Sequence, residues 1–280
     1  EELAFRIDKR RGTWISLRAG LEMKFLTATG QSASCKGQLA YQRLDEKVLL
    51  QCWNEKGELL FAFKTLDRDF ELYLPLQKTL FQGSIFSLED SPHIESHLRA
   101  LDLYRALKPA AIPFEAAKEV QSENGKWRLK IYRTGFLSHP EAQGTEGSPG
   151  ETLRFAQGDR AYKTSSSSGG EDSFLAREVL VTTEGDVVEE RYYSSEPNRL
   201  SVRISRLGFD KMEGHSAKQE FFFPRKIKIE SPKEISDEEA RSETVLLFQN
   251  LEFLPQLPEE EFHFSPPAGT KVIALDESLG

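Results

Sequence analysis

Apolar and polar residues alternate along the first third of the chain, and this period of two limits the fold more than any other feature. Between residues 15 and 25 every odd position is apolar, whereas most even positions are polar or charged. A β-strand directs successive side chains to opposite faces, so such a segment has one buried and one solvated face. The sequence therefore predicts a long, half-buried strand here.

Similar segments follow, separated by turn-forming residues at intervals of roughly 8–12 residues, as in an antiparallel meander. The further predicted strands cover residues 35–41, 48–53, 59–64, 70–74, 127–132, 176–182, 187–193, 200–207, 219–230 and 243–254. About ten or eleven strands are too many for a flat sheet, so a strongly curved or closed antiparallel sheet is expected. The predicted fold class is mainly β (α+β).

Helical spacing replaces the alternation in the middle of the chain. Ser87 or Ser91 can cap a helix that ends before Pro109. Its apolar residues recur at helical intervals: Ile94, Leu98, Leu101 and Leu107. A shorter helical piece is predicted over residues 114–120. One long helix after several strands suits a plug or lid across the open side of a curved sheet.

Residues 135–173 differ in composition from the rest of the chain. They are rich in glycine and serine, including the run Ser165–Ser168. A segment this polar cannot bury enough apolar area to offset the entropy lost on ordering. Because strand-like alternation resumes after it, we interpret it as a flexible insert between two strands. The chain is then a single domain, residues 1–280.

Charge and hydropathy exclude several classes of protein. The net charge is −8 and the pI is near 5.4, so no general attraction to nucleic acid is expected. No stretch approaches the roughly 18 consecutive apolar residues of a membrane-spanning helix. The chain begins at Glu1 without a methionine. We therefore expect that an upstream piece was removed, whether a tag, an expression junction or a signal peptide.

His93 and His97 are the first candidates for metal chemistry. They stand four residues apart on the predicted helix, a spacing that can share a metal ion. The pattern His-Ile-Glu-Ser-His does not place a glutamate where a zinc protease has its base, and no third ligand is evident. A solvated helix face is the favoured interpretation, so no metal site is predicted.

Other catalytic patterns are also missing from the sequence. Gly144, Gly147 and Gly150 recur every three residues, but the strand and helix that flank a phosphate-binding loop are absent. Glu189-Glu190 and Glu238-Glu239 are adjacent pairs, which on a strand point to opposite faces and are predicted to be solvated. We therefore predict no enzyme, no catalytic residues and no cofactor.

Two cysteines, Cys35 and Cys52, are too few for a disulfide-dense scaffold or a cysteine-rich zinc site. They lie on neighbouring predicted strands, and a turn centred near Arg43-Leu44 would place them opposite each other. They can pair in an oxidising compartment. Whether they do is left open, because sequence does not fix the register of a hairpin.

Aromatic residues are unevenly distributed among types, with 19 Phe against 7 Tyr and 3 Trp. Ordinary core packing accounts for any one of them. A curved sheet covered by a single helix, however, has little material to fill its concavity, and cavities lined by Phe and Leu bind acyl chains or other apolar ligands. The predicted lining residues are Leu21, Met23, Phe25, Leu39, Tyr41, Phe61, Phe63, Phe70, Leu98 and Leu101.

Several motifs resemble proteins that sort lipoproteins to the bacterial outer membrane. The early chain resembles receptors of the LolB type in three segments: Gly37-Gln38-Leu39 through Trp53, Gly57-Glu58-Leu59-Leu60 and Leu72-Tyr73-Leu74-Pro75. The late chain resembles the periplasmic carrier LolA in Phe223-Pro224, Asn250-Leu251-Glu252-Phe253, Phe262-His263-Phe264 and Pro267-Ala268-Gly269-Thr270-Lys271-Val272. The resemblance spans most of the chain outside residues 135–173.

This resemblance implies a half-barrel of about eleven strands, closed by helices, whose apolar cavity accepts the acyl chains of lipoproteins. We expect a monomer in the periplasm or at the outer membrane, lipid-anchored, with its N-terminal signal absent from this chain. The alternative is a structural or sensory envelope module of the same fold that binds a protein partner. The receptors carry a hydrophobic residue on a protruding loop, whereas the matching turn here, residues 54–57, is polar. Carrier, receptor and structural relative therefore all stay open.

Overall fold

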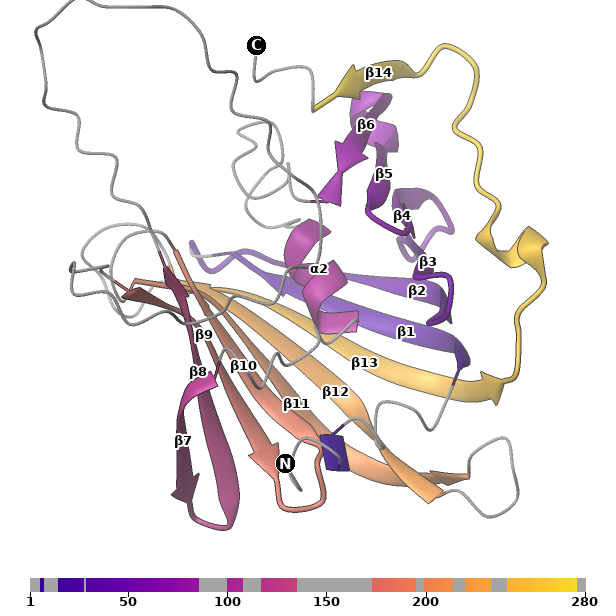
Figure 1. Cartoon of the computed structure of the whole chain (residues 1–280). Helices are drawn as coiled ribbons and strands as arrows, with labels where there is room; N and C mark the ends of the chain where they lie inside the picture. Colours follow the sequence, from indigo (N-terminus) through magenta and orange to yellow (C-terminus); the bar gives the residue numbers. More distant parts are fainter. Residues whose placement is uncertain are drawn as a thin grey trace, which may run out of the picture.

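The computed structural model describes residues 6–7, 15–27, 29–85, 100–107, 117–134, 173–194, 199–213, 220–232 and 241–275. Its strands form one sheet of 14 strands in the order β14-β6-β5-β4-β3-β2-β1-β13-β12-β11-β10-β9-β8-β7 (Figure 1). Neighbours are antiparallel except β14 and β6, which are parallel. The mainly β class expected from the alternation is confirmed.

The strands run from the centre of the sheet to one edge and then from the other edge back to the centre. The first group is β1 (Ser16–Leu26), β2 (Ser32–Gln42), β3 (Lys47–Trp53), β4 (Leu59–Leu66), β5 (Asp69–Leu74) and β6 (Thr79–Ser84). The second group is β7 (Ala117–Glu123), β8 (Lys126–Thr134), β9 (Ser173–Thr182), β10 (Val187–Tyr193), β11 (Leu200–Glu213), β12 (Glu220–Pro232) and β13 (Arg241–Leu254). Pairing of β1 with β13 joins the two groups, with Leu21 opposite Phe248.

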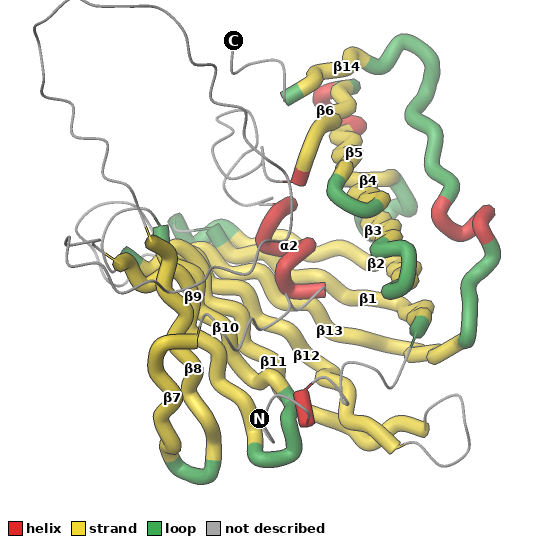
Figure 2. The backbone as a smooth tube through the Cα atoms, viewed as in Figure 1, coloured by secondary structure: helices red, strands yellow, loops and turns green. Residues whose placement is uncertain are grey.

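Helix α2 (Ala100–Leu107) lies in the hollow of the curved sheet (Figures 1 and 2). Its buried residues include Leu101, Leu103 and Leu107, which belong to the same apolar cluster as the inner side chains of β1. The expected arrangement of a curved sheet with a covering helix is therefore confirmed in outline. The predicted helical residues 91–99 lie outside the described part of the chain.

The expected number of about eleven strands is too small, and β6, β7 and β14 (Lys271–Ala274) account for the difference. In β6 the alternation is hidden because Phe81 packs in the interior while its neighbour Leu80 packs in a separate cluster on the outer face. Strand β14 pairs with β6, which is distant in sequence, so the local sequence pattern does not predict this pairing.

The helical piece predicted over 114–120 is wrong for residues 117–120, which form part of β7. The turn that follows favours a β-hairpin over a helix, because Asn124 and Gly125 both have positive φ angles, 50° and 73°. Such a two-residue turn matches the twist of a hairpin, and Val120 pairs opposite Leu129 of β8. Cross-strand pairing outweighs the weak helix preference of this segment.

The glycine- and serine-rich stretch connects two strands that are neighbours in the sheet. Thr134 at the end of β8 pairs with Ser173 at the start of β9, so residues 135–172 join the two arms of one hairpin. Their predicted flexibility concerns residues outside the described part of the chain.

The segment after β13 crosses the outer face of the sheet before it forms β14 (Figure 1). It contains a short 3-10 turn, η5 (Glu259–Phe262), and we call residues 255–270 the strap. Leu257 and Phe262 of the strap bury Ala40 and Leu49 on the outer face of β2 and β3. Both faces of this part of the sheet are therefore covered.

Candidate functional site

The largest apolar cluster in the described residues lies between the concave face of the sheet and α2. The predicted lining residues come together in it: Leu21, Met23, Leu39, Tyr41, Phe61, Phe63, Phe70 and Leu101 are buried there, and the half-buried Phe25 packs against them. Leu98 lies outside the described residues. The backbone register explains this convergence, because Met23 stands opposite both Cys35 of β2 and Leu246 of β13.

Aromatic pairs continue this interior face across β12 and β13. Phe221 and Phe253 meet edge to face with ring centroids 4.8 Å apart, and Phe223 and Phe248 do so at 5.3 Å. Phe222, between the two inward residues of β12, is 40% exposed on the other face. Edge-to-face packing is the geometry that aromatic rings favour, so these residues form a continuous apolar wall.

A disulfide joins Cys35 and Cys52 on β2 and β3, with their Cα atoms 5.9 Å apart. The expectation that they stand directly opposite is wrong, because the turn occupies residues 43–46 and Cys52 faces Gly37 instead. A Cβ atom at Gly37 would lie 2.9 Å from the Gln51 carbonyl oxygen and 3.5 Å from Cys52 Sγ. Glycine at this position therefore allows the close approach of β2 to the Gln51 carbonyl group of β3.

Charged residues interrupt the apolar interior at β9, β10 and β11. Glu190 is 0% exposed and forms ion pairs with Arg177 and, at 2.7 Å, with Arg206. The prediction that Glu189 and Glu190 point to opposite faces agrees with this placement. The prediction that both are solvated is wrong for Glu190, because its side chain is fully buried. Glu189 pairs with Arg203 on the outer face.

The buried charges also contact Tyr192 and the helix. The Tyr192 hydroxyl donates a hydrogen bond to Glu190 Oε1 at 3.0 Å, and the Arg105 guanidinium of α2 lies 4.5 Å from the Tyr192 ring centroid. Arg206 Nη2 donates to the carbonyl oxygen of Ala106 at 3.3 Å. We call Arg105, Arg177, Glu190, Tyr192 and Arg206 the ionic cluster.

Electrostatics keep this cluster charged. Burial alone would raise the pKa of the Glu190 carboxyl, but the charges of Arg206 and Arg177 outweigh it and hold the pKa below its usual range. Burial, followed by the Glu190 charge, raises the pKa of the Tyr192 hydroxyl, which therefore stays protonated as a donor. The cluster thus holds an ionised carboxylate between guanidinium groups.

The ionic cluster was not predicted from the sequence, although the sequence contains a signal for it. Arg177, Glu190 and Arg206 each occupy the same phase as an inward apolar residue two positions away: Val179, Tyr192 and Ile204. Residues two apart on a strand point to the same face of the sheet. A charged residue two positions from an inward apolar residue, on each of three neighbouring strands, therefore indicates buried charges.

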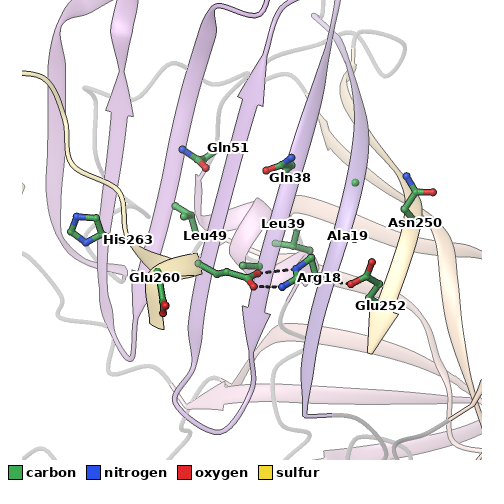
Figure 3. A pocket seen from close by; sticks show the side chains of 13 residues that line it. Arg18, Ala19, Gln38, Leu39, Leu49, Gln51, Asn250, Glu252, Glu260 and His263 are labelled. Carbon is green, nitrogen blue, oxygen red and sulfur yellow. Dashed lines mark hydrogen bonds and ion pairs between the residues drawn. The ribbon is translucent and has the colours of Figure 1, made fainter. Parts of the chain in front are cut away.

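A hollow of about 560 Å³ lies on the outer face between the sheet and the strap (Figure 3). Polar side chains line much of it, among them Gln38, Gln51 and Asn250. Arg18 bridges to Glu261 of the strap, Nε to Oε2 at 2.9 Å, and to Glu252 at 3.0 Å. These interactions fasten the strap. The polar lining makes this hollow a poor match for an acyl chain.

The described residues contain neither a candidate metal site nor a helix that could span a membrane. No group of three or more histidine, cysteine or acidic side chains there could hold a metal ion. His93 and His97 lie outside these residues. None of the described helices is long and apolar enough to cross a membrane.

Solved structures share this arrangement over nearly their whole length. A LolA superfamily protein from Nitrosomonas europaea aligns with a TM-score of 0.55 at 12% identity, covering 94% of this chain and 96% of the other. A protein domain from Vibrio parahaemolyticus described as outer membrane lipoprotein-sorting aligns with a TM-score of 0.57 at 13% identity, covering 93% and 94%. The chain is therefore similar in fold to these proteins.

A DUF1329 family protein from Desulfovibrio piger shares the LolA-like fold, with a TM-score of 0.57 at 14% identity and coverage of 94% and 95%. No family model matches the sequence, and no curated protein matches it either. The expectation of a LolA-like fold is therefore confirmed by shape. At these identities the likeness concerns the fold alone.

Proposed function

We infer that the protein is a non-catalytic lipid-binding protein of the bacterial cell envelope. It holds acyl chains of lipoproteins or other lipids against the concave face, beneath α2, in lipoprotein transport or localisation at the outer membrane. The observation that carries this proposal is the continuous apolar wall of β1–β5, β12 and β13 with helix α2 over it. Apolar concave sites of this kind bind apolar ligands.

Two further observations support an envelope location. The Cys35–Cys52 disulfide is typical of oxidising compartments such as the periplasm. Relatives in fold include a domain described as outer membrane lipoprotein-sorting. We place the protein in the periplasm or at the outer membrane, attached there by a lipid anchor, and we expect a monomer.

Native mass spectrometry of the protein purified from a bacterial envelope tests this proposal. We expect an adduct with the mass of an acyl lipid that disappears after organic extraction. A clean apo mass, under conditions in which a known carrier keeps its ligand, would contradict it.

A tryptophan reporter locates the ligand. Phe25→Trp places an indole at the half-buried inner face of β1, and Phe222→Trp places one on the outer face of β12. A brominated fatty acid should quench the additional fluorescence of Phe25→Trp and leave that of Phe222→Trp unchanged. Equal quenching of both would place the lipid on the surface instead of in the interior.

A protein-binding module of the same fold is the second candidate. Strand β7 is at one edge of the sheet, with β8 as its only strand neighbour among the described strands, and Val120 on it is 52% exposed. Such an edge can add a strand from a partner. Capture of a partner peptide that depends on residues 117–123, by a protein free of lipid, would favour this candidate.

A further inference from the structure

The ionic cluster and the apolar wall form one continuous interior surface. Arg206 stands opposite Ile227 of β12 and two positions from Ile204, and both isoleucines belong to the apolar cluster. Tyr192 packs against the same cluster while its hydroxyl reaches Glu190. A molecule on the apolar wall that extends toward β11 therefore meets guanidinium groups next.

One buried hydrogen-bond donor of Arg206 has no partner among the described residues. The residue is 5% exposed. Its Nη2 forms the ion pair with Glu190 and donates a hydrogen bond to the Ala106 carbonyl oxygen. Its Nη1 has no hydrogen-bond partner among the described residues. A buried donor without an acceptor costs free energy, and the cost is larger for a charged group. An acceptor that arrives with a ligand removes that cost.

The charge of the surroundings selects the kind of acceptor. Glu190 is ionised, and among the described residues it is the only carboxylate paired with Arg206. The same carboxylate also pairs with Arg177, so one negative charge faces two guanidinium groups. Arg105 of α2 also lies beside Tyr192, but its charge is paired with the buried Asp102 at 3.6 Å. Arg206 is therefore the guanidinium that can take a further acceptor. A guanidinium fork binds the oxygens of a carboxylate or phosphate in a planar, charge-assisted geometry, which favours an anion over a neutral group.

We propose that Arg206 binds the oxyanion head of an amphiphile, a carboxylate or a phosphate monoester, whose acyl chain lies on the apolar wall. This inference rests on the proposed lipid-binding function and adds the ligand class. The head would donate no proton and form no covalent bond. It would accept hydrogen bonds from the guanidinium where apolar wall and ionic cluster meet.

The first test compares ligands on the unaltered protein. Palmitate, hexadecyl phosphate and hexadecanol carry the same chain and differ in the head, so calorimetric affinities isolate the head group. We expect both anions to bind at least about tenfold more tightly than the alcohol, as charge-assisted hydrogen bonds predict. Equal affinity of all three would overturn the inference and leave the acyl-binding function intact.

Two other outcomes are informative in different ways. If none of the three ligands binds, the proposed lipid-binding function itself fails, and this inference fails with it. If inorganic phosphate alone binds as tightly as hexadecyl phosphate, the site takes a free anion and the coupling to an acyl chain is overturned. A preference for one of the two anionic heads identifies which source of oxyanion the protein uses.

The second test removes the donor. Arg206→Met keeps much of the side-chain length, and we expect it to abolish the preference for palmitate while hexadecanol affinity stays within about twofold. Arg206→Lys should restore part of the preference because it keeps the charge. Arg203→Met, on the outer face of the same strand, is the matched control and should leave all affinities unchanged. An unaltered preference in a folded Arg206→Met protein would refute the assignment.

Discussion

The two halves of the interior face are built from different chemistry. Over β1 to β5 the inward positions carry mainly apolar side chains, such as Leu21, Leu50 and Phe63. Over β9 to β11 the same phase of the alternation carries Arg177, Glu190 and Arg206 among valines and isoleucines. The first half is stabilised in proportion to the area it buries, and no single contact decides its stability. The second half is stable only when its charges are complete, because a buried charge without its partner is costly.

Glu190→Gln should have the largest effect and tests the ionic half directly. The substitution leaves two buried guanidinium groups without their shared carboxylate, so we expect a loss of about 3–5 kcal/mol in the free energy of unfolding. Urea denaturation measures it. Glu189→Gln, on the outer face of the same strand, is the control. Its partners Arg191 and Arg203 are 31% and 34% exposed, so the loss should be clearly smaller than that of Glu190→Gln. Equal losses would show that burial does not distinguish the two glutamates.

Removing the disulfide tests the apolar half. The double variant Cys35→Ser, Cys52→Ser frees a loop of sequence separation 17, and we expect a loss of about 3 kcal/mol. Chemical denaturation of the variant and of the unaltered protein, with and without reductant, measures this loss. The reductant should lower the stability of the unaltered protein toward that of the variant and leave the variant unchanged. A variant as stable as the oxidised protein would show that packing alone holds this half together.

Acid should affect the two halves unequally. The pKa of Glu190 is lowered in the folded protein, so its stabilising contribution is present above the pKa of the unfolded chain, about 4.3, and is lost as pH falls through the folded pKa. The stability difference between the unaltered protein and Glu190→Gln should therefore shrink steadily below about pH 4. Denaturation curves between pH 3 and 7 give this difference. A constant difference would mean that the pKa of Glu190 is the same in the folded and the unfolded protein.

The sequence predicted the apolar half well and the ionic half poorly, for a physical reason. In β1, alternation alone places Leu21 and Met23 on the buried face, and the antiparallel register then joins them to Phe61 and Phe63. The acidic pair at 189 and 190 gives no such indication, because whether a charge is buried depends on what covers that face. Here Arg105 and Ala106 of α2 contact Tyr192 and Arg206, the neighbours of Glu190, and the position of α2 is not encoded near residue 190.

The β14 edge of the sheet was missed because it depends on a distant segment. β14 forms only because the strap brings Lys271 beside Thr79 of β6. The outer burial of Leu80, which hid the alternation of β6, depends on the cluster that includes Phe264 of the strap. Local periodicity can predict a half-solvated strand, but it is lost where a later part of the chain covers the second face.

Arg18→Gln should have the smallest effect, and it separates ion pairing from burial. Arg18 makes ion pairs with Glu252 and Glu261, as Arg177 and Arg206 do with Glu190, but its side chain is 44% exposed on the outer face (Figure 3). Water and salt screen such pairs, so we expect a loss below about 1 kcal/mol that shrinks further in high salt. The loss in Glu190→Gln should persist at the same salt concentration, because water is excluded from its partners. If Arg18→Gln proved as costly as Glu190→Gln, the strap that Arg18 fastens would have to fold as one unit with the sheet. The contrast between the two halves would then reflect connectivity instead of burial.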